Sequence, residues 1–212
     1  AQARGQLLFE HVDVRKTITI EHKADVIANF AAIHREPGHE LEEYFETNLI
    51  GAENVTAFAE KIQCRQLIFT SSISPYGVSE NEKNEQTLPL PVTAYGSSKL
   101  VAEKIHQCWQ LKHVDNRLVI VRPGVVFGAG EFGNMSRLIK ALLKRYFVFM
   151  GNQNTRKAGV YVKELCHAMW WVLQNQNRAN ETVSLFNMTM FPAPSVAEYC
   201  SAICSVANIE RS

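Results

Sequence analysis

The sequence of 212 residues has neither a long run of like charge nor a long apolar run. Its 22 Lys and Arg nearly balance its 21 Asp and Glu, which gives no indication of a nucleic-acid or anionic-membrane partner. The longest apolar stretch, residues 118–126, is interrupted by Arg122 and is too short to cross a bilayer. The first residues lack the pattern of a secretory leader. We therefore expect a cytoplasmic protein without a membrane segment.

Paired cysteines are also missing. The five cysteines are odd in number and none are spaced as Cys-x-x-Cys, so neither a disulfide framework nor a metal site is expected. Cys200 and Cys204 lie four apart on an expected helix, and they are interpreted as buried, small apolar side chains. A reducing cytoplasm fits this composition best.

What the sequence does contain is an alternation of β-rich and amphipathic helical runs. The pattern predicts strands at residues 7–14, 25–32, 66–71, 118–126 and 182–186, and helices at residues 40–61, 94–112, 162–174 and 195–207. Strands separated by helices of this length favour parallel β-α-β crossovers. The predicted fold class is therefore α/β, with a doubly wound parallel sheet.

The pattern changes after Gly128, where glycines and a polar stretch at residues 152–157 interrupt the alternation. Segments of this kind often form a lobe over the carboxyl ends of the strands, where substrates bind. We therefore divide the chain into a core, residues 1–128, and a mixed segment, residues 129–212. The second segment is expected to supply a small substrate lobe and the remaining core elements.

The densest polar chemistry lies in two blocks. Thr70-Ser71-Ser72 ends a strand, and Tyr95-Gly96-Ser97-Ser98-Lys99 begins a helix, which places Tyr95 and Lys99 on one face. A lysine ammonium beside a phenol favours the phenolate and lowers the tyrosine pKa from its usual value of about 10. Tyr95 is then a candidate proton shuttle, and Ser72 could hydrogen-bond the same substrate oxygen. Tyr-x-x-x-Lys alone is also common on ordinary surface helices.

The two blocks resemble the active-site segments of extended short-chain dehydrogenases/reductases of the NAD-dependent epimerase/dehydratase family. There, a strand ending Thr-Ser-Ser-x-x-x-Tyr-Gly precedes a Tyr-Gly-x-Ser-Lys-x-x-x-Glu helix. The resemblance runs from about residue 8 to residue 165. Four further segments take part: Asp13-Val14-Arg15, Phe30-Ala31-Ala32-Ile33-His34, Asn48-Leu49-Ile50-Gly51-Ala52 and Arg122-Pro123-Gly124-Val125-Val126-Phe127-Gly128. Six ordered blocks that agree in type and spacing make coincidence an inadequate explanation.

The resemblance implies a catalytic triad of Ser72, Tyr95 and Lys99 and an NAD cofactor. The residues that it assigns to the cofactor are Asp13, Val14, Phe30, Ala31, Ala32, His34, Asn48, Tyr95, Lys99, Pro123 and Val126. Those that it assigns to the substrate are Ser72, Ser74, Arg156 and Lys157. Alternatives remain open: Phe30 as a core residue, His34 as a solvated loop residue, and Asn48 as a polar residue satisfied locally.

One family feature has no counterpart in this sequence. Family members begin with a strand, a glycine-rich turn and a helix that binds the pyrophosphate, and nothing before residue 7 resembles this unit. We therefore expect a Rossmann-type sheet from which the first β-α-β unit is absent. The residue that selects NAD over NADP lies in that unit, so NADP is not excluded.

The residues after Ser72 bear on the reaction. Ile73 and Ser74 stand where the family's dehydratases have an acidic pair, and neither side chain is an acid or base at neutral pH. The sequence thus favours an epimerase that oxidises a nucleotide sugar to a keto sugar and reduces it again. The alternatives are a carbonyl reductase, favoured by Val125 in place of a common asparagine, and a non-catalytic cofactor-binding protein.

The expected partners are a small-molecule substrate and a second copy of the chain. The resemblance implies a homodimer formed through the helices at residues 40–61 and 94–112, although their apolar stripes would equally serve the core. Arg137, after a glycine-containing turn, is interpreted as a solvated surface charge rather than an anion contact.

Overall fold

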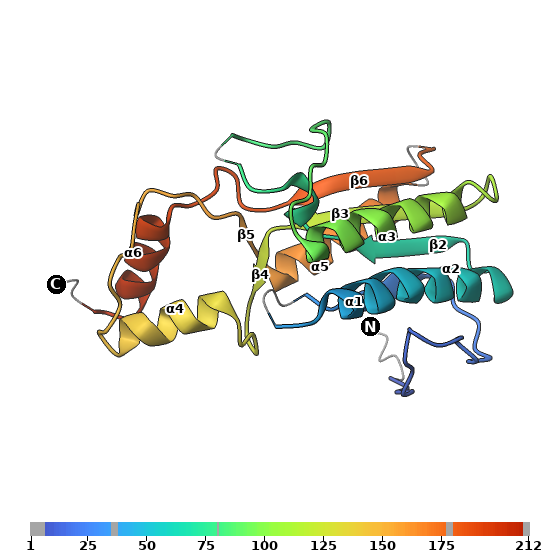
Figure 1. Cartoon of the computed structure of the whole chain (residues 1–212), viewed down its shortest axis with the longest axis horizontal. Helices are drawn as coiled ribbons and strands as arrows, with labels where there is room; N and C mark the ends of the chain where they lie inside the picture. Colours follow the sequence, from blue (N-terminus) through green and yellow to red (C-terminus); the bar gives the residue numbers. More distant parts are fainter. Residues whose placement is uncertain (1–6, 35–37, 80, 177–179, 210–212) are drawn as a thin grey trace, which may run out of the picture.

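The computed structural model describes residues 7–34, 38–79, 81–176 and 180–209. Its centre is a parallel sheet of β1 (Ile27–Asn29), β2 (Gln66–Thr70), β3 (Arg117–Pro123) and β6 (Val183–Met188), in the order β1-β2-β3-β6 (Figure 1). All three strand pairs are parallel. The predicted α/β class with a parallel sheet is confirmed.

Helices cover both faces of this sheet. One helical run consists of α1 (Leu41–Phe45), the π-helical turn η1 (Glu46–Ile50) and α2 (Gly51–Lys61), and it packs beside α3 (Ala94–Gln110). Leu67, Phe69, Leu118 and Ile120 point into the core beneath these helices. On the opposite face, α5 (Val162–Gln176) packs over Ile68, Val119 and Val121. Alternate residues of each strand thus enter opposite cores, which is the doubly wound arrangement.

The strand expected at residues 7–14 does not form, so that prediction is wrong. No described strand pairs with this segment, and Leu7 and Phe9 are largely exposed. β-rich composition produces a strand only where a neighbour accepts and donates the ladder hydrogen bonds. The second expected strand is shorter, at Ile27–Asn29, and only Asn29 within it is buried. Among the described strands, β1 pairs with β2 alone.

The long strand expected at residues 118–126 divides at Gly124. A Cβ atom there would lie 2.6 Å from the carbonyl oxygen of Ala158, so only glycine allows this close approach of two backbones. Beyond it, β4 (Val125–Phe127) leaves the main sheet and pairs in parallel with β5 (Gly159–Tyr161). The chain crosses here from the core to a second structural unit.

That unit contains α4 (Asn134–Leu143) and α6 (Val196–Val206), which pack together at one end of the molecule (Figure 1). Leu142, Cys200 and Cys204 are buried between them in a separate apolar cluster. The predicted burial of Cys200 and Cys204 is confirmed; Cys64 is buried too, whereas Cys108 and Cys166 are exposed. Within the described part of the chain, no helix is long and apolar enough to cross a membrane.

His106 lies in the core between α3 and the sheet. Its ring stacks on Phe69 with centroids 4.1 Å apart, and its Nδ1 lies 2.7 Å from the carbonyl oxygen of Ala102. A carbonyl oxygen only accepts, so Nδ1 carries the hydrogen and Nε2 accepts from the Asn29 amide at 3.2 Å. Burial lowers the pKa of His106 to about 4, which keeps the ring neutral.

We expect His106 to make the fold sensitive to mild acid. The unfolded chain binds a proton near the ordinary histidine pKa of 6.5 and the folded chain only near 4, so stability falls as pH drops through this window. Compared with His106→Gln, the wild-type protein should lose about 2–3 kcal/mol more unfolding free energy between neutral pH and the lower end of that window. Urea unfolding at several pH values measures the difference.

The control is His167→Gln, which removes an exposed histidine from α5. This variant should keep the wild-type pH dependence. Identical pH profiles for His106→Gln and the wild type would contradict the buried, neutral state of His106.

Candidate active site

A buried lysine marks the carboxyl end of β2. The Lys99 side chain extends from α3, is 2% exposed, and donates a hydrogen bond of 2.6 Å to the carbonyl oxygen of Thr70. Its Nζ lies 4.3 Å from the centre of the Phe69 ring. Burial lowers the lysine pKa to about 8, while the Glu103 carboxylate opposes this shift. The ammonium therefore stays mainly charged at neutral pH.

Ser72 and Ser74 form a small hydroxyl cluster just beyond the strand. The Ser72 Oγ donates to the Ser74 Oγ and accepts from the Ser74 backbone N–H, both at 3.1 Å. Ser72 is largely buried, while Ser74 belongs to the short helix η2 (Ser74–Tyr76), which contacts α3. Two of the predicted substrate residues thus lie together.

Tyr95 lies in the first turn of α3, next to this cluster. Thr93 caps the helix by accepting from the Gly96 N–H at 3.0 Å. A Cβ on Gly96 would lie 2.8 Å from the carbonyl oxygen of Ser74, so glycine allows the helix start to touch the loop. The half-buried Tyr95 ring lies 6.5 Å from that of Tyr44. The structure therefore brings Ser72, Tyr95 and Lys99 to one end of the sheet.

A buried ion pair holds this strand end against the helix. Arg122 of β3 donates to both carboxylate oxygens of Glu103, at 2.8 and 2.6 Å, and Ser71 donates to the same carboxylate at 2.5 Å. The Arg122 guanidinium also lies 4.8 Å from the centre of the Tyr76 ring. The sequence motifs gave Glu103 no role in the site. Its position one helical turn beyond Lys99, together with an arginine inside an apolar strand, was the available signal.

Two side-chain amides hold the segment after β1, where the cofactor contacts are predicted. The Asn29 Oδ1 accepts from the Ala31 N–H at 3.2 Å. Asn48 accepts from the Ile33 N–H at 3.0 Å and donates to the Ser98 Oγ at 2.8 Å. Both amides are buried and both link this segment to α3, Asn29 through His106 and Asn48 through Ser98. Asn48 is therefore satisfied by distant segments rather than locally.

The other residues predicted to contact the cofactor differ in exposure. Phe30 is 59% exposed, so the alternative of a core residue is wrong. Ala31 and Ala32 are half-buried, and His34 is exposed. Pro123, at the end of β3, is buried, and Val126 in β4 is half-buried. All of these follow the carboxyl ends of β1 and β3.

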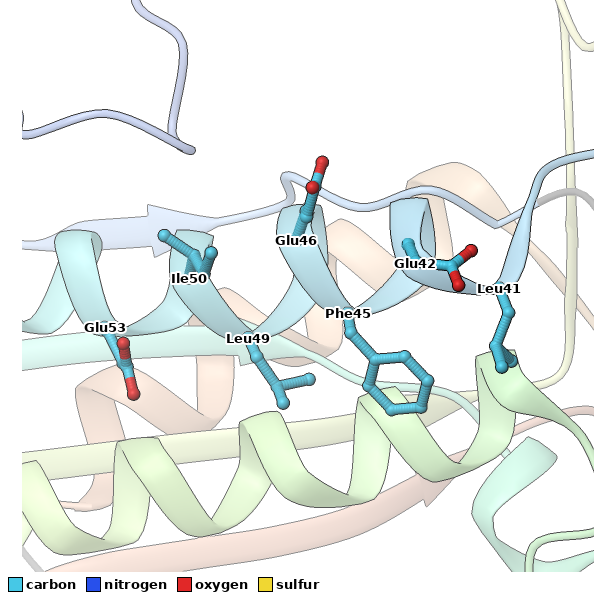
Figure 2. A pocket seen from close by; sticks show the side chains of 7 residues that line it. All are labelled: Leu41, Glu42, Phe45, Glu46, Leu49, Ile50 and Glu53. Atoms are coloured by element: carbon cyan, nitrogen blue, oxygen red, sulfur yellow. The ribbon is translucent and has the colours of Figure 1, made fainter.

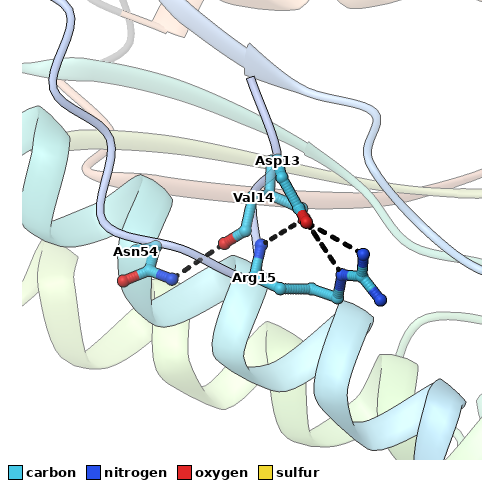
Figure 3. A network of polar contacts seen from close by, with 4 residues as sticks. All are labelled: Asp13, Val14, Arg15 and Asn54. Atoms are coloured by element: carbon cyan, nitrogen blue, oxygen red, sulfur yellow. Dashed lines mark hydrogen bonds and ion pairs between the residues drawn. The ribbon is translucent and has the colours of Figure 1, made fainter. Parts of the chain in front are cut away.

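The segment of Asp13 and Val14 runs along the outer side of α2 (Figure 3). Asp13 accepts hydrogen bonds from the Arg15 backbone and guanidinium at 2.9–3.2 Å, and these bonds lower the pKa of Asp13 to about 2. Asn54 donates to the Val14 carbonyl oxygen at 2.8 Å, which ties the segment to α2. The bond to α2, rather than strand pairing, holds the segment in which the adenine contact is predicted.

The basic pair predicted to contact substrate lies in the lobe of α4 and α6. Arg156 is exposed, donates to the Ala193 carbonyl oxygen at 2.5 Å and is 3.9 Å from the Glu198 carboxylate. Lys157 is exposed and its backbone N–H donates to the Pro194 carbonyl oxygen at 2.9 Å. Arg137 is exposed on α4, with its guanidinium 2.5 Å from the Asn134 side chain. These charges belong to the lobe, whereas the Ser, Tyr and Lys set belongs to the core.

The donor set at Lys99 fits a dinucleotide cofactor. Among the described residues, the ammonium donates to Thr70 alone, so two of its three N–H groups are available to a ligand. A ribose offers hydroxyl acceptors that match this need. The described residues include no group of three His, Cys, Asp or Glu side chains arranged to hold a metal ion.

A surface hollow lies elsewhere, along the helical run from α1 to α2 (Figure 2). It is lined by Leu41, Glu42, Phe45, Glu46, Leu49, Ile50 and Glu53. None of these residues is a predicted site residue. We therefore do not assign catalysis to this hollow.

A Rossmann-type sheet with a Ser, Tyr and Lys set at its carboxyl edge defines a short-chain dehydrogenase/reductase class of protein. The family model "NAD dependent epimerase/dehydratase family" matches residues 6–185. The chain belongs to this family, as the sequence motifs predict.

Individual relatives agree. The chain is 32% identical over 152 residues to an N-acetyl-α-D-glucosaminyl-diphospho-ditrans,octacis-undecaprenol 4-epimerase from Escherichia coli O157:H7, covering 71% of this chain and 46% of the relative. It is 30% identical over 117 residues to a UDP-glucose 4-epimerase from Pisum sativum, covering 53% of this chain and 33% of the relative. The chain thus spans half or less of the length of these curated relatives.

Solved structures show the same fold. A UDP-glucose 4-epimerase superposes with a TM-score of 0.80 at 20% identity, covering 96% of this chain and 70% of that one. The UDP-glucuronic acid 4-epimerase from Bacillus cereus in complex with NAD gives a TM-score of 0.77 at 21% identity, covering 89% and 61%.

The buried ion pair generates a stability prediction. Glu103→Gln leaves the Arg122 guanidinium buried without a counter-charge, so unfolding free energy should fall by roughly 3–5 kcal/mol. Denaturant unfolding measures this loss. Glu60→Gln is the matched control because Glu60 pairs with the half-exposed His113 at 3.1 Å, and its change should stay below about 1 kcal/mol. Equal losses of unfolding free energy in the two variants would contradict a larger contribution from the buried Glu103–Arg122 pair.

Proposed function

We propose that this chain is the catalytic core of an NAD-dependent epimerase acting on a hexose carried by a diphosphate. One observation carries the proposal: a buried, charged Lys99 lies on the same helix as Tyr95 and at the strand end that leads into Ser72. Ligands of doubly wound sheets bind at these carboxyl ends. Residues 1–128 would hold the cofactor, and residues 129–212 would add the substrate lobe.

The proposed roles follow from side-chain chemistry. Tyr95 removes the proton from a sugar hydroxyl as the sugar is oxidised to a keto sugar. The keto sugar then turns its opposite face to the cofactor, and Tyr95 returns the proton when this face is reduced. Ser72 hydrogen-bonds the same oxygen and holds it in place. Lys99 stabilises the phenolate of Tyr95 by its charge and donates to the cofactor's ribose. When bound, NAD supplies the acceptor and donor of the hydride.

The cofactor would lie across the carboxyl ends of β1 and β3. Asp13 and Val14 would meet the adenine, the segment of Phe30, Ala31, Ala32 and His34 would follow the ribose and nicotinamide side, and Asn48 would lie opposite it. Pro123 and Val126 would lie near the carboxamide. NAD is proposed over NADP because complexes named for NAD, such as the B. cereus enzyme, share this fold.

The proposed substrate class follows from what the relatives' names share. The E. coli relative is named for a sugar on undecaprenyl diphosphate and the pea relative for a UDP-sugar, and both are named 4-epimerases. A hexose on a diphosphate, epimerised at C4, is common to both. Arg156 and Lys157 would contact the diphosphate and Ser74 the sugar. The Arg156 pair with Glu198, exposed and 3.9 Å long, is weak enough to exchange for a phosphate.

The experiment is turnover by the full-length gene product with NAD and a panel of UDP-, GDP-, dTDP- and polyprenyl-diphosphate sugars. Sugar stereochemistry and absorbance of reduced cofactor are followed together. Conversion of one sugar to its epimer without net reduced cofactor supports the proposal. Net cofactor consumption with a keto substrate would establish the reductase alternative that Val125 favours.

Tyr95→Phe tests the assigned proton shuttle. The variant keeps the ring but has no proton to transfer, so turnover should fall by about 10²-fold or more while NAD affinity stays near the wild-type value. Steady-state kinetics and a fluorescence titration with NAD measure the two quantities. The control, Tyr146→Phe, removes the hydroxyl of an exposed tyrosine on the lobe and should retain full turnover. Undiminished turnover in Tyr95→Phe would refute the mechanism.

The homodimer remains a proposal, supported by the apolar side of the first helical run. Leu41, Phe45 and Leu49 extend from it on the side toward α3 and line the hollow of Figure 2. α3 adds the exposed Val101. Pairing these helices with those of a second copy would bury the side chains in a four-helix contact.

Leu41→Arg tests this interface. Leu41 is 57% exposed, so the substitution should leave the fold intact while placing a charge in the proposed contact. We expect the dissociation constant of the dimer to rise by at least about tenfold, measured by analytical ultracentrifugation. The control is Leu90→Arg, at a similarly exposed leucine outside these helices. Unchanged association of Leu41→Arg would place any dimer contact elsewhere.

A further inference from the structure

The balanced charge of the whole chain conceals an uneven distribution. Residues 132–163 contain seven Lys and Arg and no Asp or Glu, whereas the rest of the chain contains 15 Lys and Arg against 21 Asp and Glu. The positive segment comprises α4, the chain after it, β5 and the first two residues of α5. One end of the molecule is therefore cationic while the remainder is acidic.

The chain after α4 turns its apolar side chains both inward and outward. Arg145 has a φ of 58°, and the bonds Arg145 N–H to Leu142 O and Tyr146 N–H to Ala141 O, at 3.0 and 3.1 Å, end the helix. In the extended chain that follows, Phe147 and Phe149 pack into the cluster between α4 and α6, with ring centroids 5.1 Å apart. Alternate side chains must then point away from the core.

The outward residues are apolar as well. Tyr146 is 63% exposed, Val148 74% and Met150 98%, and Leu143 at the end of α4 is half exposed. Lys140, Lys144 and Arg145, all exposed, lie beside them. We call these seven residues, Lys140, Leu143, Lys144, Arg145, Tyr146, Val148 and Met150, the basic–apolar face. Within the described chain nothing covers it.

We propose that the basic–apolar face docks on a lipid bilayer with anionic head groups. Its cations match the negative surface charge, and each Lys or Arg near such a surface strengthens binding about fivefold. Its aliphatic side chains enter the boundary between head groups and acyl chains, as on amphipathic segments that lie in the membrane interface. A nucleic-acid surface fits less well, because bases stack on aromatic rings and three of the four apolar residues are aliphatic.

Docking of this kind is peripheral and needs no spanning helix. It would place the lobe, with Arg156 and Lys157, against the bilayer surface. If the proposed function holds, the site could then reach a sugar whose diphosphate is anchored in lipid. The docking itself does not depend on that function, because it follows from charge and exposure alone.

The test is co-sedimentation of the full-length protein, without NAD or substrate, with vesicles. One set contains equal parts phosphatidylglycerol and phosphatidylcholine, and the other phosphatidylcholine alone. We expect binding to the anionic vesicles, at least about tenfold weaker binding to the neutral ones, and weakening by salt. Failure to bind anionic vesicles would overturn the proposal. So would preferential binding to a DNA or RNA oligomer. Neither result bears on turnover of the UDP-, GDP- and dTDP-sugars in the panel, which are soluble and need no vesicle.

Two double variants separate charge from apolar contact. Lys140→Glu with Lys144→Glu should weaken binding to anionic vesicles by at least about tenfold, and Val148→Ser with Met150→Ser should weaken it by a similar factor. The matched controls are Lys61→Glu with Lys112→Glu, and Leu111→Ser with Val114→Ser, at exposed positions outside the lobe. Circular dichroism verifies folding. Equal effects in variants and controls would overturn the assignment of this face.

Discussion

A cation buried where β2 meets α3 sets the positions of the groups around it. Lys99 is held by the Thr70 carbonyl oxygen and by the face of the Phe69 ring, and Glu103 lies one turn further along the helix. Burying a charge without partners would cost several kcal/mol. The strand end and the helix therefore cannot move apart without exposing unpaired charges, which fixes the loop of Ser72 beside the first turn of α3.

The same helix also organises the segment after β1. His106 and Asn29 connect it to Ala31, and Ser98 and Asn48 connect it to Ile33. Each connection runs through hydrogen bonds of buried side chains, so each is directional. One face of α3 thus carries Tyr95 and Lys99 and aligns the segment on which the cofactor would lie. Catalytic and cofactor positions depend on a single element.

The lobe is stabilised separately from the sheet and its two cores. Gly124 lets the chain leave the main sheet, β4 and β5 pair, and α4 and α6 form an apolar cluster that shares nothing with the two cores beside the sheet. Because this cluster is small, many apolar side chains of the lobe remain outside it. Their combination with the six basic residues from α4 to β5 gives the lobe a surface unlike the rest of the molecule.

Local pattern was sufficient for much of this protein. The alternation of strands and helices determined the α/β class, and Ser72, Tyr95 and Lys99 could be chosen because their residue types and spacing carry the chemistry. Tertiary structure decided the features that depend on contacts between segments distant in the sequence. Residues 7–14 have strand composition, but no strand in the described part of the chain pairs with them. Glu103, His106 and Asn29 acquire roles only when distant segments bury them together, because desolvation makes their hydrogen bonds obligatory. The outward direction of Val148 and Met150 was likewise decided by which alternate side chains the small lobe core could accept.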